Sequence, residues 1–282
     1  MNLESKDLLV LKNNNLKVTL SPRGAAIYRI RFNNKDMVLT TKNHNDFYRD
    51  DIFFGKTIGR VAGRIAKDNQ IMLHGGSKGF SNCDFDTSFE DNKVVFSYLS
   101  KDGESGFDGN VKIKVIYEIH NNSLLVKYLC KTDKPTLLCL TNHSYFNLGE
   151  SNLDNLSLKM TANKYITTDK DLLPISLKPI NEKYDFHEFT PVLKYDDIDN
   201  SFMVDDKIIK LKSHRYSLLI ESDFEGVQIF TDHFNLNVDT LLSDKQIHRA
   251  VAIEPQDNQL NRKVLLPNEV YERYIKYTFS KL

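Results

Sequence analysis

The ten residues that decide the fold class read VKIKVIYEIH and run from Val111 to His120. Apolar residues occupy every second position from Val111 to Ile119, and most of the residues between them are charged or polar. A period of two is typical of a β-strand with one face buried and the other in water. We therefore predict a half-buried strand at this position.

The same alternation recurs along the chain in both directions. It appears at residues 16–20, 156–160, 216–220 and 271–279. Clusters of Gly, Asn, Asp and Ser separate these segments, as turn chemistry requires, and no segment has the period of a long amphipathic helix. The stretch from Thr168 to Asp199 holds three prolines and little regularity, so we expect long loops there. The pattern predicts an all-β fold, a large antiparallel sandwich in which residues 1–282 form a single domain.

Composition narrows the class of partner. The 282 residues include 38 Lys and Arg side chains against 38 Asp and Glu side chains, so the formal net charge is zero. A neutral chain has no long-range attraction for nucleic acid or an anionic membrane. We therefore expect a small neutral molecule as the partner, with no nucleic acid and no membrane, while the oligomeric state is not indicated.

The cysteines and the amino terminus bear on the cellular compartment. The chain has an odd number of cysteines, Cys83, Cys130 and Cys139, and they lack the spacing of metal ligands. We therefore expect them to be reduced residues of the core. The first residues lack the order of a signal peptide, and no apolar run approaches the length of a membrane span. We expect a cytoplasmic protein.

The segment TNHSYFNL, from Thr141 to Leu148, is the first candidate for chemistry. It places His143 among five other hydrogen-bonding side chains and two aromatic rings. Histidine titrates near neutral pH, so a histidine held in place by such neighbours is suited to donate or accept a proton. We identify His143 as a candidate acid–base residue.

Three further segments carry reactive or polar groups, namely GRVAGRI at 59–65, LHGG at 73–76 and IEPQ at 253–256. In the last of these, the apolar residues 250–253 deliver Glu254 at the end of an expected strand. Partial loss of water favours the neutral form of a carboxyl group and makes its ionised form a stronger base. Glu254 and His143 would then form a complementary pair for proton transfer.

These four segments and SKDGESGFDG at 100–109 stand in an order that resembles the aldose 1-epimerases, also called galactose mutarotases. The resemblance implies a single β-supersandwich and an isomerase that interconverts the α and β anomers of a free aldose without a cofactor or metal. It implies a role in carbohydrate metabolism, with a monosaccharide of the glucose or galactose type as substrate. By position, Glu254 matches the catalytic base and His143 the catalytic acid. The residues that match sugar contacts are Arg64, His74, Asp199 and Gln228.

The chemistry explains why such a pair is needed. A proton must leave the anomeric hydroxyl while the ring oxygen gains one, so that the bond between C1 and the ring oxygen can break. We expect Glu254 and His143 to face each other across the sugar for these two transfers. Each group is expected to contribute about 10²–10⁴-fold to the rate.

Each of these residues also has a structural interpretation. His143 is compatible with a buried histidine bonded to its neighbours, and Glu254 with a strand-end carboxylate paired with a lysine. His74, which precedes two glycines, is compatible with a simple turn, and Asp199 with a solvated acidic loop. Of the two arginines in GRVAGRI, we take Arg64 as the sugar contact and expect Arg60 to be structural, paired with a surface acid.

The sequence departs from the family pattern beside Arg64. Only seven residues separate Ile65 from Leu73, whereas relatives usually carry a longer strand pair, so we expect a hairpin near the sugar to be missing. Gly63 stands where an asparagine is common, and the chain has no tryptophan. Both changes leave the preferred sugar open.

Rival functions remain on the sequence alone. A non-catalytic sugar-binding or sensing protein could keep the same fold and pocket. An epimerase for a sugar phosphate would need extra basic residues, for which Arg60 and Lys67 are candidates. A glycoside hydrolase or lyase would need an extended cleft, and a second carboxylate in a comparable motif is not found.

Overall fold

The computed structural model describes residues 8–67, 69–90, 92–194, 197–242 and 246–282. Its regular structure is almost entirely β-strand, which confirms the predicted fold class. The strands are β1 (Leu9–Lys12), β2 (Leu16–Ser21), β3 (Ala26–Phe32), β4 (Lys35–Asp36), β5 (Thr57–Ile58), β6 (Arg64–Lys67), β7 (Gln70–Leu73), β8 (Asp86–Glu90), β9 (Lys93–Ser100), β10 (Val111–His120), β11 (Ser123–Thr132), β12 (Thr136–Leu137), β13 (Thr141–Asn142), β14 (Tyr145–Phe146), β15 (Ser157–Thr168), β16 (Pro174–Pro179), β17 (Thr190–Pro191), β18 (Asp199–Lys212), β19 (Tyr216–Ser222), β20 (Gly226–Phe230), β21 (Val251–Gln256), β22 (Val264–Leu265) and β23 (Tyr271–Lys281).

Helices contribute little to the part of the chain that the structure describes. There is one α-helix, α1 (His44–Phe47), and the short 3₁₀ helices are η1 (Phe80–Asn82), η2 (Glu104–Gly106), η3 (Leu153–Asn155) and η4 (Glu182–Tyr184). None of these helices is long and apolar enough to cross a membrane.

The decisive segment 111–120 forms β10, which pairs antiparallel with β9 on one side and β11 on the other. Val111, Ile113 and Val115 are buried, whereas Lys112 and Lys114 are exposed, as the period of two predicts. The other alternating segments lie along β2, β15, β19 and β23. These strand predictions are confirmed.

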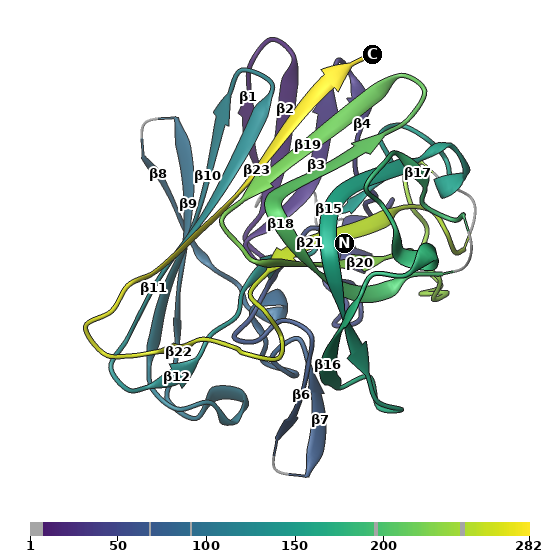
Figure 1. Cartoon of the computed structure of the whole chain (residues 1–282). Helices are drawn as coiled ribbons and strands as arrows, with labels where there is room; N and C mark the ends of the chain where they lie inside the picture. The colour runs from purple at the N-terminus through teal and green to yellow at the C-terminus, as the bar shows by residue number, and fades with distance from the viewer. Residues whose placement is uncertain (1–7, 68, 91, 195–196, 243–245) are drawn as a thin grey trace.

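The large sheet sets the frame of the molecule (Figure 1). Its strands run in the order β14-β21-β20-β18-β19-β23-β11-β10-β9-β8, all antiparallel to their neighbours, and β15 joins through β18. A four-stranded sheet of β1 to β4 lies behind it. Because strands adjacent in space come from distant parts of the sequence, the sheet gathers residues 145, 199, 228 and 254 at one end.

The two sheets share one apolar core, which makes the fold a sandwich. The core cluster includes buried residues from β1 through β23, among them Val18, Ile30, Val115 and Ile220. Phe32 and Phe279 stack across it with their ring centroids 6.0 Å apart. Cys83, Cys130 and Cys139 are free and buried, as predicted.

Two expectations about loops are wrong. The stretch 168–199 is not only loop, because β16 pairs with β15 to extend a hairpin and β17 pairs with the start of β15. A hairpin was expected to be missing after Arg64, yet β6 pairs with β7 there over four residues on each side. Two residues are enough to reverse the chain between antiparallel strands, so seven intervening residues leave room for a hairpin.

Candidate active site

Three neighbouring strands of the large sheet, β18, β20 and β21, form one side of a pocket that we call the floor. Their register sets Ser201 opposite Gln228 and Gln228 opposite Glu254, so these side chains form a row across the strands. Alternate residues share a face, so the adjacent rows on that face hold Asp199 on one side and Gln256 on the other. All five residues line one pocket of about 150 Å³.

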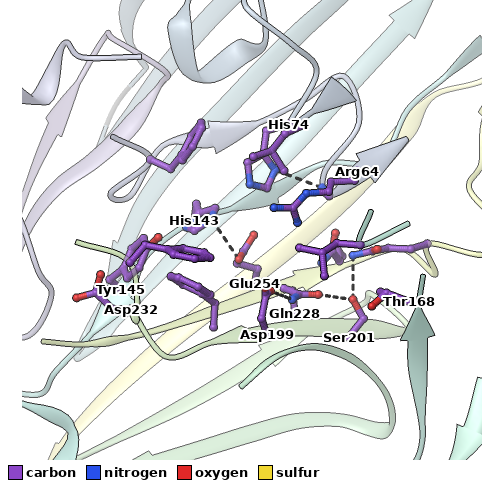
Figure 2. Close-up of a pocket in the computed structure, with 18 of the residues that line it drawn as sticks. Arg64, His74, His143, Tyr145, Thr168, Asp199, Ser201, Gln228, Asp232 and Glu254 are labelled. Atoms are coloured by element: carbon purple, nitrogen blue, oxygen red, sulfur yellow. Dashed lines mark hydrogen bonds and ion pairs between the residues drawn. The ribbon is translucent and has the colours of Figure 1, made fainter. Parts of the chain in front are cut away.

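A wall formed by residues 59–76 stands on the other side of this pocket. Arg64 begins β6 and His74 follows β7, and both line the pocket. Figure 2 shows these two side chains facing the floor residues Glu254, Gln228, Asp199 and Ser201.

The LHGG segment is a turn that also aims a side chain. His74 N donates a hydrogen bond to Gly63 O over 3.0 Å, and Gly63 N donates to His74 Nδ1 over 3.2 Å. Gly75 has φ +83°, and a Cβ there would lie 2.1 Å from the carbonyl oxygen of Gly59, so only glycine fits. The turn interpretation of this segment is therefore correct, and His74 also lines the pocket.

His143 is held rigidly between β13 and β14. Its backbone N–H donates to Lys56 O and its carbonyl accepts from Gly55 N, both over 2.9 Å. The rings of Phe53 and Tyr145 stack on the imidazole with centroids at 5.7 and 4.9 Å. These contacts fix the plane of the imidazole ring before any ligand arrives.

His143 and Glu254 are in direct contact. The distance from His143 Nε2 to Glu254 Oε1 is 3.3 Å, and the two side chains are 6% and 2% exposed (Figure 2). The acid and base therefore lie side by side, and the expectation that they face each other across a sugar is wrong. Both can still reach their targets, because the anomeric oxygen and the ring oxygen are bonded to the same carbon. Glu254 also lies within β21, not at the end of the strand.

Burial controls the charge of this pair. Loss of water lowers the pKa of His143 to about 3. It also raises the pKa of Glu254 well above the usual value, and the nearby negative charge of Asp199 adds to that increase. Burial thus favours a protonated Glu254 beside a neutral His143. This state holds the same number of protons as a carboxylate beside an imidazolium.

The same reasoning assigns the tautomer of His74. Burial and the neighbouring His143 and Arg64 lower the pKa of His74 well below 6.5. The neutral ring accepts at Nδ1 from Gly63, so its proton is on Nε2. His74 is therefore a neutral hydrogen-bond donor.

A chain of hydrogen bonds orders the polar side chains of the floor. Gln259 Nε2 donates to Ser201 Oγ over 2.8 Å, Ser201 Oγ donates to Gln228 Oε1, and Gln228 Nε2 donates to Asp199 Oδ1 over 2.7 Å. Burial raises the pKa of Asp199, and the positive charge of Arg64 opposes part of this rise. These hydrogen bonds fix the orientation of the Gln228 amide and hold one Asp199 oxygen against it.

Arg60 is structural, as expected, but the expectation that it pairs with a surface acid is wrong. Arg60 is 2% exposed, and its guanidinium donates to backbone carbonyls of residues 100, 101, 108 and 109 and to two hydroxyls instead of a surface acid. Arg64 donates no side-chain hydrogen bond to another described residue, so its guanidinium is available to a ligand. Because Arg60 is fully engaged, it is not available to bind a phosphate.

Gly63 allows Gln259 to approach the wall. A Cβ at Gly63 would lie 2.9 Å from Gln259 Nε2, and the residue has φ +73°. An asparagine at this position would displace the Gln259 amide from its hydrogen bond to Ser201.

All six residues predicted from sequence line this pocket, and the structure adds others that sequence reasoning missed. The additional polar residues include Asp51, Thr168, Ser201, Asp232, Gln256 and Gln259. Gln256 and Ser201 could have been found from the period of two, since they lie two positions from Glu254 and Asp199. Gln259 follows the end of β21, and no pattern marks it. Within the described ranges, no group of three or more His, Cys, Asp or Glu side chains is placed to hold a metal ion.

The fold and site together define a class of protein, a large β-sandwich with a buried histidine–carboxyl pair in a small polar pocket. Comparison with known proteins identifies the family. The family model described as aldose 1-epimerase matches residues 7–278, so the chain belongs to the aldose 1-epimerase family.

Individual relatives agree with this assignment. The chain is 31% identical to the bifunctional protein gal10 of Schizosaccharomyces pombe over 72% of its own length and 33% of that protein. It is 30% identical to the galactose mutarotase of Bos taurus over 58% of its own length and 55% of that protein. The match thus spans a third of the first relative and about half of the second.

A solved structure matches over the whole fold. The GalM/aldose epimerase homologue from C. elegans has a TM-score of 0.89 at 25% identity, covering 99% of this chain and 100% of that one. This agreement confirms the predicted galactose mutarotase-like architecture.

Proposed function

We propose that the protein interconverts the α and β anomers of a free aldose, with Glu254 as base and His143 as acid. The observation that carries the proposal is their buried 3.3 Å contact in a small pocket that several hydrogen-bonding side chains line. The pocket volume of about 150 Å³ is below the range of roughly 300–1,000 Å³ for drug-sized ligand sites. A single sugar ring suits such a pocket better than the extended chain of a glycoside hydrolase.

The reaction needs the pair in its charged form. The Glu254 carboxylate takes the proton of the anomeric hydroxyl while the His143 imidazolium gives a proton to the ring oxygen, and the bond from C1 to the ring oxygen breaks. The open aldehyde rotates about the bond between C1 and C2. Ring closure on the other face then returns each proton, so the pair ends the cycle with the one proton it held at the start.

The free protein stores the same proton in the uncharged arrangement that burial favours. Sugar hydroxyls that enter the pocket supply hydrogen bonds to the carboxylate, and these favour its ionised form. Transfer along the 3.3 Å contact then gives the carboxylate and imidazolium without exchange with solvent.

The remaining residues bind and orient the sugar. Arg64 has free N–H groups and stabilises negative charge on an oxygen, while neutral His74 donates through Nε2. One carboxylate oxygen of Asp199 accepts a hydrogen bond from Gln228, and the other accepts a hydrogen bond from a sugar hydroxyl. Gln228 retains one N–H and one lone pair for the ligand beyond its bonds to Asp199 and Ser201.

Polarimetry on freshly dissolved α-D-glucose and α-D-galactose tests the proposal. Wild type should accelerate equilibration, and Glu254→Gln and His143→Asn should each lose about 10²–10⁴-fold in kcat. Glu90→Gln on β8 is the matched control, since this exposed glutamate lies on the strand at the opposite end of the sheet order, and it should keep wild-type rates. Sugar binding without any acceleration would instead support a binding or sensing protein.

A further inference from the structure

Three glutamines line the pocket, and they differ in how their amides are engaged. Gln228 and Gln259 belong to the hydrogen-bonded chain that ends at Asp199. Gln256 is 2% exposed, yet its Oε1 has no hydrogen-bond partner, and no side-chain hydrogen bond joins it to another described residue. Two amides are therefore fixed within the protein and one is not.

The position of Gln256 explains why the sheet supplies no partner. It stands two residues beyond Glu254 on the same face of β21, and the residue opposite it on β20 is Gly226. Gly226 has no side chain and so offers no hydrogen-bonding group. The amide thus lines the pocket close to the proton-transfer pair, with its oxygen buried and unpaired.

Burying an amide without a partner costs free energy, and buried polar groups in proteins are nearly always bonded. When the unpaired amide lines a pocket, a ligand that forms a hydrogen bond with it removes this unfavourable free energy. An amide presents both donors and an acceptor, which matches a hydroxyl group, because a hydroxyl both donates and accepts.

We infer that Gln256 binds a hydroxyl of the sugar other than the anomeric one and helps to select the substrate, an inference that rests on the proposed aldose reaction. The spacing supports a contact away from C1, because residues two apart on a strand are separated by about 6–7 Å. Gln256 takes no part in proton transfer. It acts on substrate binding and leaves the chemical step to Glu254 and His143.

The test combines stability with kinetics in a matched pair of variants. Gln256→Met removes an unpartnered amide, so its melting temperature should equal or exceed that of wild type. Gln259→Met removes an amide bonded to Ser201 and should melt at a lower temperature. Gln70 is an exposed residue on β7, so Gln70→Met controls for the effect that a Gln-to-Met substitution has on the melting temperature by itself.

Kinetics are measured on whichever of glucose and galactose wild type equilibrates faster and on its 2-, 3-, 4- and 6-deoxy derivatives, with the spontaneous rate subtracted. Gln256→Met should lower kcat/KM for the parent sugar by about 10- to 100-fold, mostly through KM. For the one deoxy sugar that lacks the bound hydroxyl, wild type and Gln256→Met should have equal kcat/KM.

Two results would overturn the inference. The first is a Gln256→Met enzyme within twofold of wild type on every sugar. The second is an equal loss on every deoxy sugar together with a lower melting temperature, which would indicate a packing role. If wild type binds aldoses without turning them over, calorimetric Kd values for the same sugars and variants test Gln256 while the catalytic proposal fails. If wild type binds no aldose, both proposals fail.

Discussion

The floor of the pocket consists of positions on three hydrogen-bonded strands, whereas the wall at residues 59–76 is a loop and a hairpin of four residues a side. On the floor, each side chain is placed by strand register, so Glu254 and Gln228 stand together because their strands pair. In the wall, position depends on single residues, chiefly the buried Arg60 and the tight approach of Gly75 to Gly59. Of the proton-transfer pair, Glu254 thus stands on the floor and His143 lies between β13 and β14, whereas Arg64 and His74 belong to the wall.

Arg60→Met should have the largest effect, because it detaches the wall. The buried carbonyls of Ser100 and Gly109 would lose their donor, and each unpaired buried group costs about 1–3 kcal/mol. We expect the free energy of unfolding in urea to fall by about 3 kcal/mol or more. Arg64→Met is the matched arginine, and a loss of similar size there would show that the two arginines do not differ as described.

Glu254→Gln tests the floor through the pH dependence of stability. The unfolded chain releases the Glu254 proton near the ordinary value of 4.5, whereas burial keeps it bound to the native state at higher pH. Wild type should therefore lose stability relative to Glu254→Gln as pH rises above this value, until the folded pKa is passed. Each unit between the two pKa values is worth about 1.4 kcal/mol. Denaturation from pH 4 to pH 8 measures the difference, and a constant difference would contradict the raised pKa.

Arg64→Met should separate binding from stability within the wall. The free guanidinium contributes to ligand binding and little to the stability of the fold. In Arg64→Met, KM should therefore rise about 10-fold, which corresponds to a loss of about 1.4 kcal/mol in binding free energy. The free energy of unfolding should stay within about 0.5 kcal/mol of wild type. Steady-state polarimetry and urea denaturation on the same preparation decide the matter, and an unchanged KM would remove Arg64 from the sugar site.

The smallest effect is expected from protonation of His74. Its pKa lies well below 6.5, so His74 stays neutral and its contribution to binding should not change between about pH 6 and pH 8. The ratio of KM for His74→Asn to KM for wild type should therefore be constant over that range. A ratio that changes as the pH passes through 6.5 would mean that His74 titrates with an ordinary pKa.

The sequence predicted the strands well because alternation is a local property. The pattern at 111–120 needs only one buried face, and β10 has it. The stretch 168–199 was misjudged as loop because its prolines mask the pairing of β16 with β15, and Pro174 and Pro179 lie at the ends of that strand. Proline is tolerated at such strand ends, where no ladder hydrogen bond is lost.

The site was predictable where the motif residues carry the chemistry themselves. Glu254, His143, Arg64 and His74 were found because a carboxylate, a histidine or an arginine stands out in a short segment. Gln256 belongs to the IEPQ segment, but nothing in the sequence shows that its amide oxygen lacks a partner. Gln259 was missed because its bond to Ser201 joins residues 58 positions apart.

The sequence by itself determined the all-β class, because alternation is local, and it marked His143 and Glu254 as candidates for proton transfer through their residue types. The four candidate sugar contacts came from the resemblance of its motifs to the aldose 1-epimerases. Only the tertiary structure decided that His143 lies beside Glu254, that Arg60 is an anchor while Arg64 is free, and that one of three glutamines is unpaired. Those outcomes depend on which strands pair and in what register. Register is a property of the whole sheet, set by the burial of one face of every strand at once.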